Sequence, residues 1–293
     1  MPALSELFSL VVAGLASGSA YALLALGIVI IFRSTDTVNF AIGHIGVLAL
    51  YIATLAIPWV PVPVIFFATI VLGGFLGIAT ERLLIRPLGH RKNFAFVALV
   101  VTIGLSFLIH ALTGLIWGHP AINFPALVSG TILIGNFAVS ANKFAATVLA
   151  LVSMGTVAFF FGRTSLGVAM RASAEDHLGA RIVGINSHYI ARLSWFIGCA
   201  LSTLGMFFLT ADQSLSGSVA DQPLFRAIAA VFLGGLTSMS GAVLGGFLVG
   251  ILDNIAGAYF SPNFRDSVVF GVIILVLFYR PAGILGALRK ERV

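Results

Sequence analysis

Few side chains in this sequence could take part in chemistry, and they lie far apart in apolar surroundings. Asn39, His44, His110 and Asp253 each lie inside or at the edge of a long apolar run. Ionisable groups inside a membrane are costly and usually face the interior of a helix bundle. We interpret Asn39 and His44 as capping or snorkelling residues near the cytoplasmic start of a span. Asp253 is a candidate for lining a cavity or pairing two helices.

No recognisable catalytic set accompanies these residues. The sequence contains no HExxH or GxSxG motif and no Cys/His metal cluster, and its single cysteine is Cys199. It contains no Gly-Lys pair, so it lacks the GxxxxGK[ST] loop that cradles ATP phosphates. We therefore expect neither an enzyme nor a cofactor in this chain.

The elements that hold these residues are predicted to be membrane helices. Hydrophobic residues make up 59% of the chain and charged residues 9%, whereas soluble domains carry roughly a quarter charged residues. In a bilayer only helices and closed barrels satisfy every backbone group, and these apolar runs are too continuous for barrel strands. We predict an all-α integral membrane protein, a polytopic helical bundle with residues 1–293 as one domain. The scattered basic residues indicate topology rather than nucleic-acid binding.

The apolar runs predict about eight or nine transmembrane segments, including a broken helix. A span needs about 20 apolar residues. The expected spans are 7–32, 38–57, 62–85, 94–117, 144–161, 189–211, 225–236, 242–259 and 268–279. The break at Thr237–Gly241 matters because interrupted helices are tolerated only inside protein or beside a water-filled cavity, and they often line transport paths. The candidate pathway residues are Asn39, His44, Gly234, Gly235, Gly241 and Asp253.

Basic residues predict the orientation of the chain. They cluster in segments 82–92, 163–192 and 280–292, which the positive-inside rule places in the cytoplasm. The outer loops 118–142 and 212–224 contain no lysine or arginine. With nine crossings, the N-terminus is then outside.

The longest hydrophilic cytoplasmic segment, 163–188, is predicted to form a short helix. Thr164 or Ser165 can cap its start, and Gly184 suits the left-handed position after its end. An apolar stripe is formed by Leu166, Met170, Ala174, Leu178 and Ile182. Such a stripe could dock into a groove of a partner protein. The alternative is a loop helix that packs on its own membrane domain.

Glycines four residues apart recur inside the apolar segments. The pairs are Gly14/Gly18, Gly73/Gly77, Gly241/Gly245 and Gly246/Gly250. Because glycine lets two helix backbones approach closely, we interpret these pairs as ordinary helix-packing positions.

Three stretches together resemble a known family. They are 18–27 running on to Val38–His44, Leu166–Asp176 with Gly184-Ile185-Asn186, and Leu233–Gly246 with Arg280–Gly286. Over nearly its whole length the sequence resembles the LivH-type permease subunit of bacterial ABC importers for branched-chain amino acids. The resemblance implies an inner-membrane location and a pathway for leucine, isoleucine or valine.

The resemblance also implies partners and coupling residues. The expected partners are a second homologous permease, two cytoplasmic ATPases that hold ATP and Mg, and a periplasmic solute-binding protein. The ATPase-coupling residues would be Gly167, Arg171, Ala172, Glu175, Asp176, Gly184 and Asn186. Two alternatives stay open: a permease for urea or short amides in the same family, and an ion-coupled secondary amino-acid transporter that uses Asp253.

Overall fold

The computed structural model describes residues 4–89, 91–118, 120–134, 137–259 and 264–286. In these residues the chain is mainly helical, with α1 (Leu4–Thr35), α2 (Ile42–Thr54), α3 (Val62–Thr80), α4 (Phe94–Trp117), α5 (Ala141–Arg163), α6 (Ser165–Glu175), α7 (His177–Ile182), α8 (Ser187–Gln213), α9 (Asp221–Gly234), α10 (Met239–Tyr259) and α11 (Arg265–Tyr279). Helix α3 continues through a π-helical segment, η1 (Glu81–Ile85), into a 3-10 turn, η2 (Arg86–Leu88).

Six helices in the described part of the chain are long and apolar enough to cross a membrane. They are Leu10–Thr35, Val62–Leu88, Phe94–Trp117, Ala141–Arg163, Ser187–Gln213 and Met239–Tyr259. Each coincides with a span predicted from the apolar runs, so the prediction of a polytopic helical membrane protein is confirmed. Helices α9 and α11 also lie where helices were expected, but they have only 14 and 15 residues.

Helix α2 corrects the predicted full-length span at 38–57. It has 13 residues, and at 1.5 Å per residue it is about 20 Å long, shorter than the ~30 Å hydrocarbon core. The chain leaves α1 at Thr35 and passes through Asp36, whose φ is 51°. Residues 37–41 form a loop in which Thr37, Asn39 and Ala41 are buried, so this part of the predicted span is not helical.

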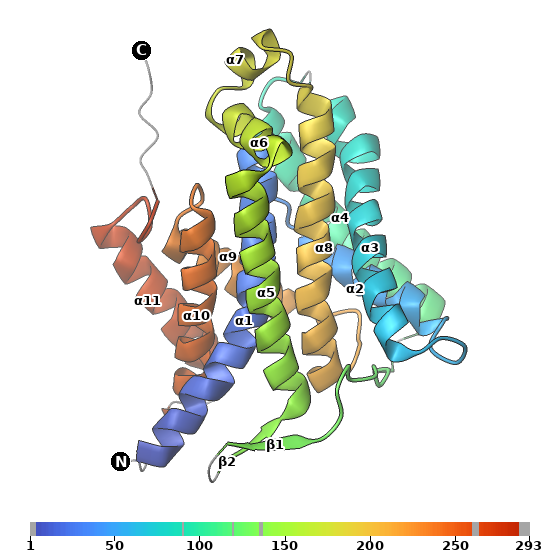
Figure 1. Ribbon diagram of the computed structural model, residues 1–293, viewed down its shortest axis with the longest axis vertical. Helices are drawn as coiled ribbons and strands as arrows, with labels where there is room; N and C mark the ends of the chain where they lie inside the picture. Colours follow the sequence, from blue (N-terminus) through green and yellow to red (C-terminus); the bar gives the residue numbers. More distant parts are fainter. Residues whose placement is uncertain (1–3, 90, 119, 135–136, 260–263, 287–293) are drawn as a thin grey trace.

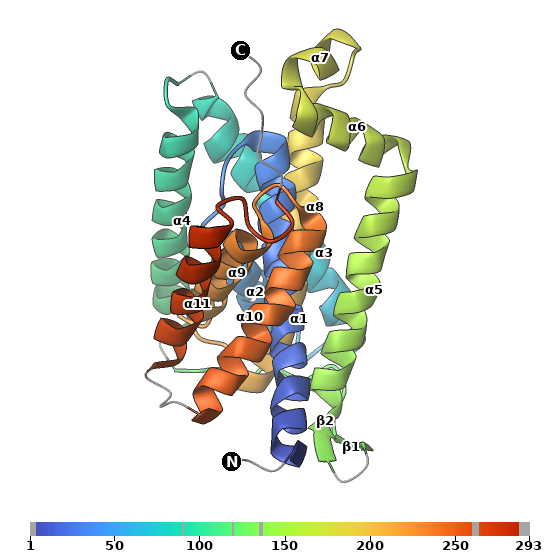
Figure 2. The same ribbon diagram turned by 90° about the vertical axis from the view of Figure 1, so that its left-hand side faces the viewer.

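Helix α1 runs through the centre of the bundle (Figures 1 and 2). It packs against α5, α8, α9 and α10. Of the residues in its most apolar 18-residue stretch, 83% are buried. Its contact with α10 is close because a Cβ added to Gly14 would lie 2.7 Å from the Cα of Ile251, and one added to Gly18 would lie 3.0 Å from the Gly246 carbonyl oxygen. The glycine pairs of α1 and α10 are therefore helix-packing positions, as predicted.

One short hairpin was not predicted. Strands β1 (Thr131–Ile134) and β2 (Phe137–Ser140) pair antiparallel, with Thr131 opposite Ser140. The hairpin lies within the segment expected to form an outer loop, at the end of the bundle where α1 begins (Figure 1).

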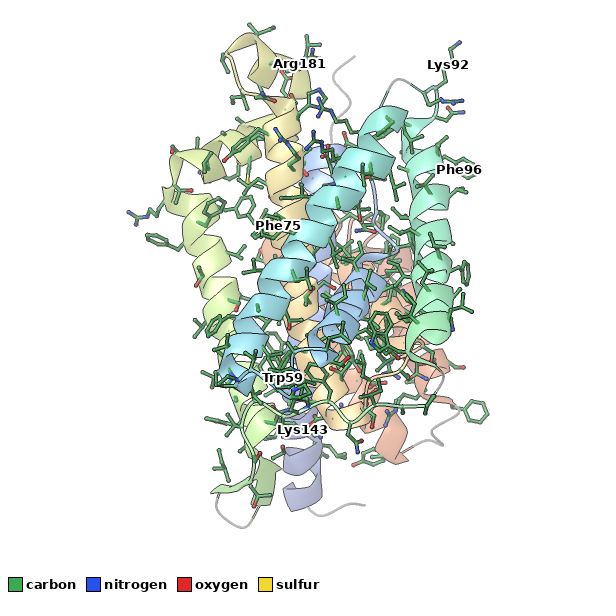
Figure 3. The ribbon with its side chains drawn as sticks, turned by 90° about the vertical axis from the view of Figure 1, so that its right-hand side faces the viewer. Trp59, Phe75, Lys92, Phe96, Lys143 and Arg181 are labelled. Atoms are coloured by element: carbon green, nitrogen blue, oxygen red, sulfur yellow. The ribbon has the colours of Figure 1, made fainter. Side chains whose placement is uncertain are left out.

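The charged and aromatic loop residues are divided between the two ends of the bundle. Figure 3 places Lys92 and Arg181 at one end, and Trp59 and Lys143 at the other. Helices α6 and α7 lie at the first end (Figure 1). Two of the three predicted basic segments thus share an end, as the positive-inside rule requires. The basic residues Arg289, Lys290 and Arg292 of the third segment lie outside the described residues.

Candidate functional site

The segment between α5 and α8 forms a projecting arm, residues 164–186. Helix α6 crosses from the end of α5 toward α8, and α7 is the outermost helix at that end (Figures 1 and 2). Thr164 Oγ1 accepts a hydrogen bond from the N–H of Gly167 at 3.0 Å. This cap satisfies an N–H group that a helix start leaves free, and it confirms the predicted beginning of the helix.

The arm is bent because a second cap interrupts it. Asp176 is extended, with φ −147° and ψ 100°, and its Oδ1 accepts hydrogen bonds from the N–H groups of Leu178 and Gly179, both at 2.9 Å. Asp176 therefore ends α6 and caps α7. Gly184 follows with φ +87°, as predicted, and Asn186 Oδ1 caps α8 by accepting from the Tyr189 N–H at 3.1 Å.

The bend corrects the predicted apolar stripe. Met170 of α6 is buried, with 3% exposure, whereas Leu178 and Ile182 of α7 are 71% and 79% exposed. Because the two helices point in different directions, side chains four apart in sequence do not form one ridge. The apolar surface available to a partner lies on α7 and on Val183, which is 75% exposed.

The remaining predicted coupling residues lie on α6. Arg171, Ala172 and Glu175 are exposed. Gly167 packs against the end of α5, where an added Cβ would lie 2.7 Å from the Cα of Phe161. The predicted set thus combines exposed side chains with residues that shape the arm.

The break between α9 and α10 lies where the sequence placed it and is closed by the C-terminal segment. Gly235 has φ +109°, a region that favours glycine. The N–H groups of Ile284 and Leu285 donate to the carbonyls of Leu233 and Gly234 at 2.8 and 3.0 Å. These bonds satisfy carbonyls left free at the end of α9, so an interrupted helix is tolerated here.

The glycines of the break are packing residues. Gly234, Gly235 and Gly241 are all buried, and Gly234 and Gly241 face each other so closely that a Cβ on either would overlap the other's backbone. Their predicted pathway role stays a prediction. The two serines between Gly235 and Gly241, Ser238 and Ser240, line open space instead.

That open space is a groove of about 870 Å³ between α1, α5, α6 and α10. It joins the break to the arm, because Ser238 and Ser240 line one part of it and Arg171 lines another. The rest of its wall is mainly apolar: Leu26, Met154, Val157, Ala158, Phe161, Met239, Val243, Leu244 and Leu285. Arg33, in the last turn of α1, also lines it.

Asn39 and His44 lie deeper than expected. Asn39 is fully buried, and its Oδ1 accepts a hydrogen bond from the N–H of Ala41 at 2.9 Å. This bond closes a turn before α2 and does not cap the helix, because the N-cap residue is Ala41 and no side chain caps it. His44 Nε2 lies 3.1 Å from Asp221 Oδ1, and the His44 and His110 ring centroids are 6.4 Å apart. Because Asp221 begins α9 and was assigned to an outer loop, His44 is not a snorkelling residue at the cytoplasmic end.

Asp253 belongs to an ionic cluster that joins four helices, in which Asp253 and Arg226 are buried and Arg265 and Asp266 are partly exposed. Its Oδ1 lies 3.2 Å from Arg226 Nη2 of α9 and 3.6 Å from Arg265 Nε of α11. Arg226 also reaches Asp266 Oδ1 at 3.3 Å and donates to the hydroxyl of Tyr21 of α1 at 2.9 Å. The two arginines and two aspartates balance in charge. Their mutual attraction offsets the free energy of desolvating charged groups inside the bundle.

Sequence reasoning singled out Asp253 but missed its partners. Arg226 lies within the predicted short span 225–236 and was given no role, and Tyr21 was one aromatic residue in an apolar run. An arginine inside an apolar segment could have indicated an acidic partner elsewhere in the bundle. The pairing of Arg226 with Asp253 could not be predicted from one sequence, because the two residues are 27 positions apart and a helix break lies between them.

The fold is similar to that of PsaBC from Streptococcus pneumoniae, solved in complex with a Fab, with a TM-score of 0.50 and 14% sequence identity over 93% of this chain and 91% of that one. At this identity the likeness concerns the fold alone.

Sequence comparison identifies the family. The family model described as "Branched-chain amino acid transport system / permease component" matches residues 10–277, and the chain belongs to this family. It is 31% identical to the high-affinity branched-chain amino acid transport system permease protein BraD of Pseudomonas aeruginosa, over 100% of both chains. It is 30% identical to LivH of Escherichia coli, over 96% of each, and 26% identical to the autoinducer 2 import system permease protein LsrC of Escherichia coli, over 87% of this chain and 74% of that one.

Proposed function

We propose that this chain is a permease subunit of an ATP-driven importer for leucine, isoleucine and valine, in the inner membrane of a bacterium. The relatives that match along nearly their whole length, BraD and LivH, are named as branched-chain amino acid permeases. The chain then forms half of the translocation pathway, and a second homologous permease forms the other half. A periplasmic solute-binding protein delivers the amino acid. Counting the six long helices and the shorter helices α2, α9 and α11, the permease has nine membrane segments, of which α2 crosses only part of the bilayer.

The observation that carries the mechanism is the bent arm. Its apolar side chains on α7 are exposed at the end of the bundle that holds the basic loops. An exposed apolar patch at that end marks a surface that binds a partner. These side chains fit a groove on a cytoplasmic ATPase, with Arg171, Glu175 and Asp176 fixing the register. Two such ATPases hydrolyse ATP with Mg, and this chain itself holds no cofactor.

The ionic cluster argues against an ion-coupled secondary transporter. Such a carrier needs an acidic group that is free to bind the driving ion. Asp253 is held by Arg226 and Arg265 at 3.2 and 3.6 Å, so its negative charge is already compensated. The cluster holds α1, α9, α10 and α11 together instead.

Arg171→Glu tests the coupling role. In proteoliposomes that contain the permeases, ATPases and binding protein, we expect the variant to lower ATP-driven uptake about tenfold, the effect of losing about 1.4 kcal/mol at an interface. Arg91→Glu is the matched control, because Arg91 is an exposed arginine of another basic loop, outside the arm. Normal uptake by Arg171→Glu, with normal membrane insertion, would refute the coupling role.

Competition in the same assay tests the solute. Unlabelled isoleucine or valine in excess should suppress uptake of labelled leucine, whereas urea or acetamide should leave it unchanged. Suppression by urea or acetamide alone would favour the short-amide alternative.

A further inference from the structure

The groove beside the arm has an apolar body and a basic end formed by Arg33 and Arg171. The proposed coupling role uses Arg171 but not the apolar body of the groove or Arg33. We propose that this groove binds an anionic glycerophospholipid, with an acyl chain in the apolar body and the phosphate at Arg33 and Arg171. The inference is independent of which solute the permease carries.

The apolar body of the groove is open space of ligand size. Its volume of about 870 Å³ is within the usual range for small-molecule sites. Helices α5 and α10 both lie beside α1 but are separated from each other (Figure 2), and Gly155 and Gly162 of α5 line the groove. A Cβ added to either glycine would meet no atom of the described residues within 4 Å, so protein side chains do not fill this space.

The basic end of the groove complements a phosphate diester. Arg33 and Arg171 line both the groove and a narrow extension of it. Glu175 is close enough to Arg33 to interact with it electrostatically, so two arginines and one glutamate leave a net charge of +1. One anionic phosphate matches that charge, and arginine binds phosphate oxygens with charge-assisted hydrogen bonds.

A buried hydroxyl at the same end points to a ligand oxygen. Ser194 of α8 has 0% exposure, and its Oγ has no hydrogen-bond partner among the described residues. Buried polar groups are rarely left in this state. Ser194 lines the narrow extension beside Arg33 and Arg171. At about 10 Å³ the extension admits a single oxygen atom rather than a whole headgroup.

The position of the basic end in the membrane favours a lipid over a helix of another protein. It lies beside the arm, at the end that carries the basic loops, which the positive-inside rule assigns to the cytoplasm. The cytoplasmic leaflet is the one enriched in anionic lipids. An apolar helix of a second copy could cover the wall, but it would leave Arg33, Arg171 and the Ser194 hydroxyl without an anion.

Native mass spectrometry of the full-length permease in detergent tests the site. Palmitoyl-oleoyl phosphatidylglycerol and the phosphatidylcholine with the same acyl chains are added at equal concentration. We expect one phosphatidylglycerol to stay bound preferentially. Gly155→Leu places a side chain in the groove at a position where an added Cβ meets no atom within 4 Å, and Arg33→Gln removes one charge. Arg33→Gln should lower phosphatidylglycerol binding about fivefold, the effect expected for one arginine near an anionic lipid. Gly155→Leu should lower it as well, because its side chain takes space that the acyl chain would fill.

Two matched variants serve as controls. Gly104→Leu also adds a side chain where a Cβ would meet no atom within 4 Å, but on α4, away from the groove. Arg91→Gln removes an exposed arginine at the same end of the bundle. Both should bind phosphatidylglycerol as the unaltered chain does, and all four variants should elute as monodisperse proteins.

Three results would overturn the proposal. The first is equal binding of the two lipids. The second is unchanged phosphatidylglycerol binding by both Gly155→Leu and Arg33→Gln, which would place the lipid elsewhere. The third is loss of permease–permease association in Gly155→Leu with lipid binding intact, which would make the groove a protein interface. Because no ATPase or solute is present, failure here leaves the transport proposal standing.

Discussion

At the scale of single residues, the most demanding groups are charges inside the bundle. Arg226 is 7% exposed and Asp253 is 2% exposed, and their side chains meet at 3.2 Å. Desolvating either charge alone costs several kcal/mol. Each residue is therefore tolerable only because the other is present.

The pairing of these two residues can be tested by a double-mutant cycle. Arg226→Met leaves Asp253 with only the more distant Arg265, so we expect it to destabilise the permease by about 3–5 kcal/mol. Asp253→Leu should have a similar cost because it leaves Arg226 buried without its nearest aspartate. The double variant should be more stable than either single variant. Thermal unfolding in detergent measures this, and strictly additive losses would show that the pair is not coupled.

At the scale of elements, capping residues decide the shape of the arm. Asp176 ends α6 and begins α7 within a single residue, which turns Leu178 and Ile182 outward while Met170 stays buried. A continuous helix over the same residues would place these side chains on one stripe. The bend thus gives the arm an apolar tip that a straight helix would not have.

The tip can be tested with charges. Ile182→Asp should leave the membrane bundle folded, because Ile182 is 79% exposed, but should lower ATP-driven uptake at least about tenfold by placing a charge in an apolar interface. Val168→Asp is the control, since Val168 is an exposed valine of α6 away from the tip. Equal uptake by Ile182→Asp and the unaltered permease would show that α7 does not dock a partner.

At the scale of the whole molecule, the two ends of the bundle differ in charge. The arm and the basic turn after α3 share one end, and Trp59, Lys143 and the hairpin share the other (Figures 1 and 3). A bilayer around such a bundle has one stable orientation, because lysine and arginine in short loops stay in the cytoplasm. Among the residues that the structure describes, Lys143 is the lysine at the opposite end, and it lies 3.8 Å from Asp212, so its charge is compensated.

Cysteine labelling of intact cells tests this orientation. Cys199 is fully buried, so one cysteine can be introduced at a time with little background labelling from Cys199. Trp59→Cys should react with a membrane-impermeant maleimide added outside, because Trp59 is 86% exposed. Arg181→Cys should react only after the membrane is opened. The reverse pattern would contradict the assignment of the arm to the cytoplasm.

Properties that depend on local order along the chain could be predicted from the sequence. Apolar run length fixed the positions of the six long helices, because a helix that satisfies its own backbone is required in hydrocarbon. Local hydrogen bonding made the cap at Thr164 and the left-handed Gly184 predictable. The spacing of glycines in α1 and α10 likewise indicated close helix contact, since a missing side chain is visible in any sequence.

Properties that depend on residues far apart were decided only by the tertiary structure. The short α2, the pairing of His44 with Asp221 and the cluster around Asp253 all join segments that the sequence does not relate. The groove beside the arm likewise exists only because α5 and α10 both pack on α1 without packing on each other. The physical reason is that apolar residues have the same hydropathy whether they face lipid, a loop or another helix. Burial and pairing are therefore settled by which helices meet, and a single sequence does not record which helices meet.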